Sequence, residues 1–222
     1  MVTISGKSGW NQDAENWQRE TLGNKVVAAL KANLFDAVYV ADREEATRFV
    51  LSFCQPGKKV AHGGSMTLMR DMDILPKIRQ SGATLIEHIY GEPEAMFEAR
   101  RQQLMSDVFL CSVNAVTMDG WLVSVDGAGN RTGAMTFGPR KVIVVAGTNK
   151  ICADLDAAWK RLEKVACPLN MKRLDLPNPC TRAGYCVDCR TETRGCRIYT
   201  VVKRRPMLTD LTVVIVGENL GY

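Results

Sequence analysis

A chain of 222 residues that is 46% hydrophobic and 24% charged has the composition of a globular protein, long enough to bury a core without disulfides. The formal net charge is +5, but the basic residues are dispersed and aromatic residues make up only 7%, which argues against nucleic acid and favours a small anionic partner. The chain shows neither a secretory leader pattern nor an apolar run long enough to span a bilayer, so we expect a cytoplasmic protein with no membrane partner.

Strand-like and helix-like segments alternate over the first half of the chain. Residues 1–34 are predicted to form a helix, because Trp17 and several later leucines and valines recur at helical spacing. Beyond it, the pattern predicts strands at 36–42, 58–62, 84–86 and 107–113 and helices at 44–53, 66–80 and 92–103. This alternation predicts an α/β fold with a mostly parallel sheet and helices on both faces.

The pattern changes after residue 114. Segments 121–126, 132–137 and 141–146 have the composition of strands and are joined by short glycine-rich stretches, which predicts antiparallel strands added to the parallel sheet. A helix is expected from Cys152 to Ala166, with Val165 on its apolar face, and a buried strand at 211–216. We therefore predict one α/β domain over residues 1–222, with a cysteine-rich loop at about 177–198.

The cysteine-rich loop is the strongest candidate for a metal centre. It contains Cys180, Cys186, Cys189 and Cys196, and the Cys-x-x-Cys turn at its middle lets two sulfurs converge on one metal. Four thiolates suit either zinc or a [4Fe–4S] cluster; the single Cys-x-x-Cys pair slightly favours the cluster, because zinc ribbons usually carry two. Unpaired surface thiols or disulfides are the alternative. The remaining cysteines are expected to fill the core: Cys54, Cys111, Cys152 and Cys167.

A second candidate site is the glycine-rich segment that follows the strand at 58–62. Gly63 and Gly64 let the backbone turn tightly and approach a ligand, while Ser65 and Thr67 offer hydroxyl groups at the start of the next helix. We expect this segment to bind the anionic part of a small molecule. A plain turn with a helix cap is the alternative.

Three further segments, at 114–117, 126–131 and 147–150, are expected at the ends of strands. Ligands of open α/β sheets bind beyond the carboxyl ends of the strands, where such loops converge. Ordinary turn chemistry explains each segment alone, but together they predict further ligand-binding residues: Asn114, Asn130, Arg131, Asn149 and Lys150. Arg131 is expected to grip a carboxylate through two parallel hydrogen bonds, so that Arg131→Ala would weaken ligand binding and leave the fold intact.

Two residues near these segments are candidates for moving a proton. His62 immediately precedes the glycines and titrates near neutral pH when unperturbed, although a packed histidine at the end of a strand is the plainer interpretation. Asp126 is placed where a general base could face a substrate, although an Asp-Gly turn explains it equally well. His88 has no motif around it and is expected to be structural.

Several of these motifs together resemble the LUD (lactate-utilisation) domain family. They are Val60-Ala-His-Gly-Gly-Ser65, Val113-Asn-Ala-Val-Thr117, Val125-Asp-Gly-Ala-Gly-Asn-Arg131 and Gly217-Glu-Asn-Leu-Gly221. The resemblance implies a fold similar to ribose-5-phosphate isomerase, glucosamine-6-phosphate deaminase and the CoA-transferases, with loops that hold small anionic metabolites. It also implies a link to iron–sulfur-dependent lactate oxidation. The four late cysteines look like those of a stand-alone subset of the family.

The sequence and this resemblance together lead to one expected function and two alternatives. We expect a protein that binds a 2-hydroxy acid or a sugar-derived acid, with the metal centre structural or relaying electrons. The alternatives are a non-catalytic accessory or metabolite-sensing protein with structural zinc, and an isomerase or transferase for a phosphorylated sugar. An iron–sulfur oxidoreductase and a second copy of the chain are the protein partners to consider.

Overall fold

The computed structural model describes residues 10–222, so the first nine residues of the predicted first helix lie outside the described part of the chain. The helix α1 spans Trp10–Ala32. Its second half is buried through Val26, Val27 and Leu30. Trp17, predicted to share the apolar face, is 68% exposed, so this part of the prediction is wrong: the first half of the helix extends beyond the core.

The predicted parallel sheet is confirmed and has six strands. Their order across the sheet is β1-β10-β7-β4-β2-β3, and every neighbouring pair is parallel. The strands are β1 (Asp36–Val40), β10 (Asp210–Val216), β7 (Lys141–Gly147), β4 (Val108–Cys111), β2 (Lys59–His62) and β3 (Thr84–Ile86). The segment at 141–146 was expected to run antiparallel, but as β7 it lies near the centre of the sheet and runs parallel to both neighbours.

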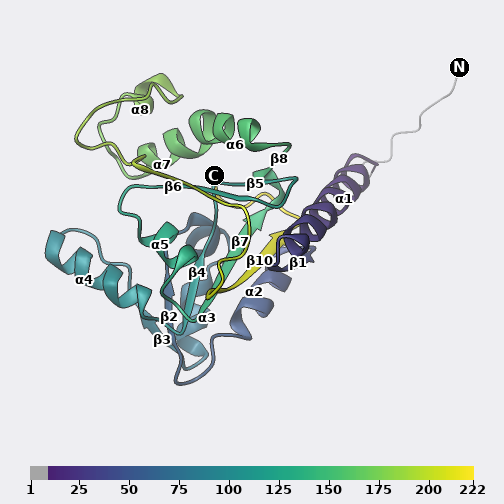
Figure 1. The fold of residues 1–222 in the computed structure, drawn as a ribbon, viewed down its shortest axis with the longest axis horizontal. Helices are drawn as coiled ribbons and strands as arrows, with labels where there is room; N and C mark the ends of the chain where they lie inside the picture. The colour runs from purple at the N-terminus through teal and green to yellow at the C-terminus, as the bar shows by residue number, and fades with distance from the viewer. Residues whose placement is uncertain (1–9) are drawn as a thin grey trace, which may run out of the picture.

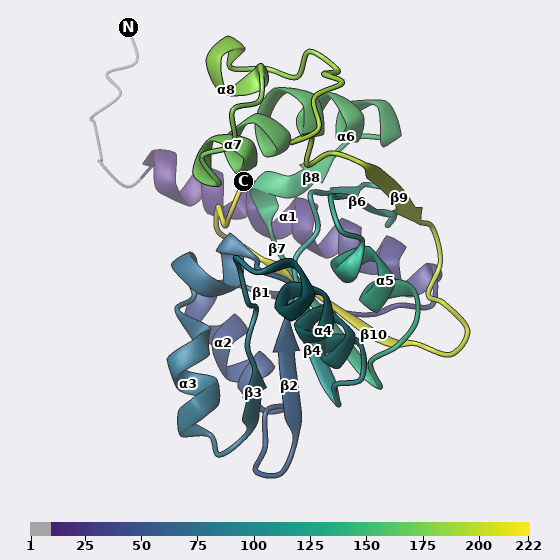
Figure 2. The same cartoon turned by 90° about the vertical axis from the view of Figure 1, so that its left-hand side faces the viewer.

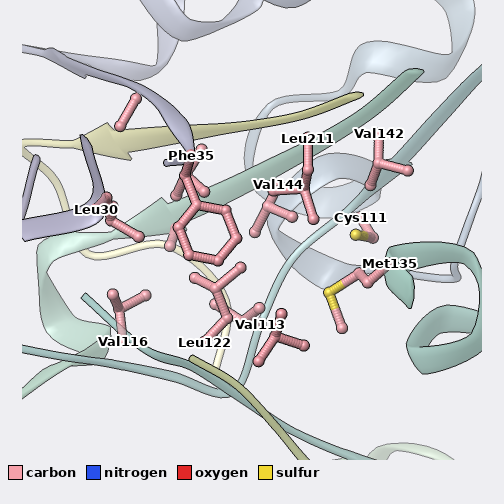
Figure 3. Packing of buried hydrophobic residues seen from close by; sticks show 14 of the residues in the cluster. Leu30, Phe35, Cys111, Val113, Val116, Leu122, Met135, Val142, Val144 and Leu211 are labelled. Carbon is pink, nitrogen blue, oxygen red and sulfur yellow. The ribbon is translucent and has the colours of Figure 1, made fainter. Parts of the chain in front are cut away.

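Helices cover both faces of this sheet. The strand β7 illustrates why, because Ile143 and Val145 pack on one face while Val142 and Val144 pack on the other. The first face is covered by α2 (Arg43–Leu51) and α3 (Ile74–Gln80). The second face is covered by α1 and α5 (Asn130–Thr136), with α4 (Pro93–Leu104) beside α5. Figure 3 shows the core on this second face, where Leu30, Phe35, Val144 and Met135 point toward one another.

A second, smaller sheet lies over that core. Its order is β8 (Ile151–Cys152), β5 (Ala115–Thr117), β6 (Leu122–Asp126) and β9 (Ile198–Val202). The β5–β6 and β6–β9 pairs are antiparallel, so the predicted antiparallel strands exist, but in a separate layer. Its outer side is covered by α6 (Leu155–Arg161) and α7 (Cys167–Arg173), with the short α8 (Cys180–Ala183) beyond them (Figures 1 and 2).

Three predicted elements differ from the structure for identifiable reasons. Segment 132–137 is not a strand: it belongs largely to the helix α5, which begins at Asn130, and the carboxylate of Asp126 accepts the N–H of Thr132 in the first turn of that helix. The helix expected at 66–80 is interrupted, because a five-residue π-helical turn η1 (Thr67–Asp71) ends before α3. A second π-helical turn, η3 (Leu162–Ala166), shifts the buried face, so Val165 is exposed.

The two layers meet at the carboxyl ends of the parallel strands. Loops after β2, β4 and β7 face the underside of α7, and the chain ends between α7 and these strand ends (Figures 1 and 2). The strand β7 continues there into a short 3-10 turn, η2 (Thr148–Lys150). No helix in the described part of the chain is long and apolar enough to cross a membrane.

Candidate functional site

A cavity of about 230 Å³ lies between the parallel sheet and the second layer. Its floor is formed by the loops that follow β2, β4 and β7, as the strand-end argument predicted. Its roof is formed by α7 and by residues of the cysteine-rich loop. The cavity therefore brings together the glycine-rich segment and part of the cysteine segment, which are more than 100 residues apart in the sequence.

The glycine-rich segment forms the part of the floor nearest to β2. Gly63, Gly64, Ser65 and Thr67 all line the cavity. Gly64 has a φ of +71°, and a Cβ there would lie 3.2 Å from the hydroxyl of Tyr90 and 3.3 Å from the imidazole of His88, so only glycine fits. The helical turn that follows has five residues, too few to contribute a substantial helix dipole, so the charge of the cavity is set by side chains.

Lys150 is the most deeply buried cation of the cavity. It is 3% exposed, and its Nζ lies 2.7 Å from the hydroxyl of Ser112 and 3.0 Å from that of Thr67. Burial, together with the neighbouring guanidinium groups of Arg161 and Arg131, lowers the pKa of Lys150 to about 7. Lys150 was predicted to bind an anion as a cation. With a pKa of about 7, a substantial fraction of its amine is uncharged at neutral pH.

The guanidinium group of Arg131 is hydrogen bonded to other groups of the protein. Its guanidinium donates hydrogen bonds to the carboxylate of Asp126, to the side chain of Asn114 and to two backbone carbonyl groups, of Ser112 and Val125. The ion pair with Asp126 is 2.7 Å long and largely buried. This arrangement leaves no parallel pair of N–H groups for a ligand, in contrast to the expected grip on a carboxylate.

Asp126 is held in the same network. One carboxylate oxygen accepts from Arg131 and the other accepts the backbone N–H of Thr132 at 2.8 Å. Both carboxylate oxygens are therefore engaged by protein groups, and the geometry assigns Asp126 a positioning role at the edge of the cavity. It connects the end of β6 to the start of α5.

The three asparagines occupy different positions. Asn130 lines the cavity, and its buried side-chain NH₂ group has no acceptor among the described residues, so it is free to donate to a ligand. Asn114 also lines the cavity, and its side-chain oxygen accepts from Arg131 and from the N–H of Val125. Asn149 lies outside the lining; its side chain accepts the N–H of Leu220 and holds the last residues of the chain in place.

Of the two histidines, His88 lines the cavity and His62 does not. His62 is 1% exposed and lies beneath the glycine-rich segment, outside the cavity lining, where burial lowers its pKa to about 4. Its Nδ1 accepts the N–H of Gly64 at 3.3 Å, which supports the plainer interpretation of a packed histidine. His88, expected to be structural, lines the cavity, and burial followed by the charge of Arg100 lowers its pKa.

The cavity lining carries an excess of positive charge. Four basic side chains, Arg100, Arg131, Lys150 and Arg173, line it against one acidic side chain, Asp126. Arg131 pairs with Asp126, so the guanidinium groups of Arg100 and Arg173 face no acidic side chain of the lining. Sequence reasoning missed Arg100 and Arg173, because they lie within helices α4 and α7 and no local motif marks them.

The cysteines predicted to bind a metal lie at and beyond the roof of this cavity. Cys196 lines it, whereas Cys180, Cys186 and Cys189 lie further out, and no cysteine of the chain is in a disulfide. The backbone N–H of Asp188 donates to the sulfur of Cys186 at 3.4 Å. As the side chains stand, no three His, Cys, Asp or Glu groups within residues 10–222 are close enough together to hold a metal ion.

Cys167 has a position that the sequence did not reveal. It is buried in the core of the second layer, as expected, together with Cys152; Cys54 and Cys111 are buried in the two faces of the parallel sheet. Cys167 also lines the cavity, and its thiol is hydrogen bonded to Cys196, which lowers the pKa of Cys196. A fifth thiol therefore adjoins the cysteine segment.

The cysteine segment is tied to the rest of the fold by backbone contacts. The N–H of Cys186 donates to the carbonyl of Glu163 at 2.8 Å, and the N–H of Arg197 donates to the carbonyl of Asp126 at 3.0 Å. The segment therefore forms a fixed roof, attached both to η3 and to the end of β6.

Comparison with known proteins identifies the family. The family model of the LUD domain matches residues 23–216, which include both the glycine-rich segment and all four late cysteines. The chain belongs to the LUD-domain family. The resemblance inferred from the motifs is thereby confirmed. No curated protein matches this LUD-domain chain by sequence.

Solved structures support the fold of this LUD-domain protein. The crystal structure of a DUF162 family protein from Deinococcus radiodurans is 12% identical, with a TM-score of 0.50 over 89% of this chain and 98% of that one. At this identity the likeness concerns the fold alone. Ribose 5-phosphate isomerase from Plasmodium falciparum gives a TM-score of 0.27 at 14% identity, covering 50% of this chain and 52% of that one, too low to compare sites.

Proposed function

We propose that this LUD-domain protein binds a small anionic metabolite, a 2-hydroxy acid such as lactate or the corresponding 2-oxo acid, in the cavity above the parallel sheet. The observation that carries the proposal is the unbalanced charge of the lining, where the guanidinium groups of Arg100 and Arg173 face no acidic side chain other than the already paired Asp126. Arg100 and Arg173 are partly buried, so their charges are incompletely hydrated, and a bound anion would offset that cost.

The size and polarity of the cavity agree with this class of ligand. A volume of about 230 Å³ suits a metabolite of a few carbon atoms better than a nucleotide or a sugar nucleotide. The free NH₂ group of Asn130 and the hydroxyls of Ser65 and Tyr90 offer hydrogen bonds to carboxylate and hydroxyl oxygens. The family, named for lactate utilisation, is consistent with a ligand of this kind.

Two adjacent arginines provide a matched test of the binding site. Arg100 lines the cavity with its buried Nε unpaired, whereas Arg101 is 65% exposed and pairs with Glu98. We expect Arg100→Ala to weaken lactate or pyruvate binding about 10- to 100-fold, because a hydrogen bond to a charged group contributes about 1.5–3 kcal/mol. Arg101→Ala should leave the dissociation constant unchanged. Isothermal titration calorimetry measures both, and equal affinities of the two variants would contradict the proposal.

We further propose that the four late cysteines hold one metal centre at the roof of the cavity. All four thiols are reduced and belong to one segment whose backbone is fixed at both sides. Hydrogen bonds from Asp188 to Cys186 and from Thr191 to Cys189 are of the kind that stabilise thiolate ligands. Cys186 and Cys189 are only partly buried, so their side chains have room to change rotamer when a metal binds.

The identity of the metal decides between two roles. Zinc would supply a structural link that closes the roof. A [4Fe–4S] cluster would instead supply a one-electron relay beside the bound acid and would exchange electrons with an iron–sulfur oxidoreductase partner. In either role, Cys196 would connect the centre to the cavity, because it alone among the four lines it.

Cysteine substitutions test the metal centre directly. Cys189→Ser should abolish the bound metal and lower the melting temperature by several degrees, because metal binding contributes to folding free energy. Cys54→Ser, at a buried position remote from the segment, should retain the metal. Elemental analysis and visible spectra of anaerobically purified protein measure the content. Wild-type protein without zinc, iron or sulfide would contradict the assignment.

A further inference from the structure

We propose that Lys150 is the nucleophilic amine of the cavity and forms an imine with the carbonyl carbon of a bound 2-oxo acid. The inference rests on the proposed function, because it requires that the anion in the cavity carry a carbonyl group beside its carboxylate. It goes further by assigning covalent chemistry to a residue expected only to attract charge.

The hydrogen bonds around the amine fit the neutral form of lysine. An ammonium group has three N–H donors, whereas a neutral amine has two N–H donors and one lone pair. Nζ of Lys150 has two hydroxyl partners, Ser112 at 2.7 Å and Thr67 at 3.0 Å. Two partners satisfy the neutral amine and leave its lone pair for a third group. Gly221 lies next to the amine and has no side chain to block it: a Cβ at this position would lie 3.0 Å from Nζ.

The charges around the amine also favour neutrality. No carboxylate of the described residues forms an ion pair with Lys150. Burial, followed by the cations Arg161 and Arg131, lowers its pKa to about 7, and the more distant Asp71 offsets only part of this. Desolvation beside other cations is a recognised way to activate a lysine nucleophile. A lysine that served only as an anchor for charge would require no such environment.

The proposed step is balanced without an oxidant or a metal. The lone pair of Nζ attacks the carbonyl carbon, the C=O π electrons move to oxygen, and the carbinolamine then loses that oxygen as water. The water carries away both protons of the amine, and the product is a C=N bond. The hydroxyls of Thr67 and Ser112 lie within hydrogen-bond distance of Nζ, where they are placed to relay these protons. The cations Arg100 and Arg173 are available for the carboxylate of the acid.

Reductive trapping tests this step. Wild-type protein is incubated with pyruvate and cyanoborohydride at neutral pH, and the modified lysines are identified by peptide mass spectrometry. We expect the adduct at Lys150 to form at least about 10-fold faster than at the exposed Lys160. About half of the Lys150 amines are neutral near pH 7, against roughly one in a few thousand for an ordinary lysine. Excess phosphate, an anion without a carbonyl group, should compete.

Two variants and one binding measurement separate the outcomes. Lys150→Met should reduce trapping to the level of surface lysines, while Lys160→Met should match wild type. Pyruvate that binds by calorimetry but modifies only surface lysines would overturn the role of the amine and leave the proposed function standing. If pyruvate neither binds nor modifies a lysine, both the role of the amine and the proposed function are overturned. Trapping that is undiminished in Lys150→Met would also overturn the assignment.

Discussion

Arg131→Met is expected to lower the free energy of unfolding by about 3–5 kcal/mol, because it removes one partner of a buried ion pair. Asp126 would remain 8% exposed with an unpaired charge, and the carbonyl groups of Ser112 and Val125 would lose a charged donor. The same change would release Asn114 on the floor of the cavity. Urea denaturation of the variant and of wild type measures the difference.

A matched pair of changes isolates the cause of this loss. Arg101→Met breaks an exposed ion pair with Glu98 and should change stability by less than about 1 kcal/mol. Adding Asp126→Asn to Arg131→Met should recover part of the loss, since no buried charge is then left unpaired. A stability of Arg131→Met close to that of wild type would instead restore the original expectation, in which Arg131 is free to bind a ligand.

Lys150→Met is expected to change the pH dependence of stability strongly. With a folded pKa of about 7 against an ordinary 10.5, the unfolded chain binds more protons than the native protein between these values. The stability contributed by this group therefore rises with pH across that window and is lowest below pH 7. The free energy of unfolding of the variant minus that of wild type should therefore be larger at pH 7 than at pH 10, by on the order of 4 kcal/mol.

The comparison of the two proteins at each pH removes the titration of other groups. Cysteines and tyrosines titrate in the same window, but they contribute equally to wild type and variant. Lys160→Met, at an exposed position on α6, should show no pH-dependent difference. A difference between Lys150→Met and wild type that stays constant from pH 6 to pH 10 would show that Lys150 is charged in the native protein.

The central sheet was predictable because its strands carry their own signal. The apolar runs of β7 and β10 are buried on both faces, and both segments were predicted as strands from these runs alone. The direction of β7 was predicted wrongly, because the glycine-rich stretches around it suggested hairpins. The helix α5 was not predictable, since its start depends on a carboxylate, Asp126, that the second layer brings into place. The strand β9 was also missed, because its first residues, Ile198 and Tyr199, are exposed and follow the cysteine segment without a turn signal.

The site was predictable only where topology alone determines position. Loops after parallel strands converge whatever their side chains are, so Gly64, Ser65 and Lys150 were correctly expected to lie together. The role of a side chain depends on partners contributed by distant segments. Arg131 is a motif residue that turns inward to Asp126, whereas Arg173 belongs to no motif and reaches the cavity because α7 forms its roof.

A crystal structure of the protein grown with lactate or pyruvate would show directly whether the acid occupies the cavity. We expect the acid between the glycine-rich segment and α7, with its carboxylate within hydrogen-bond distance of Arg100 or Arg173 and its second carbon beside Lys150. A 2-oxo acid should appear in contact with, or joined to, Nζ of Lys150. An acid bound elsewhere on the protein, or an unchanged cavity at saturating ligand, would contradict the account.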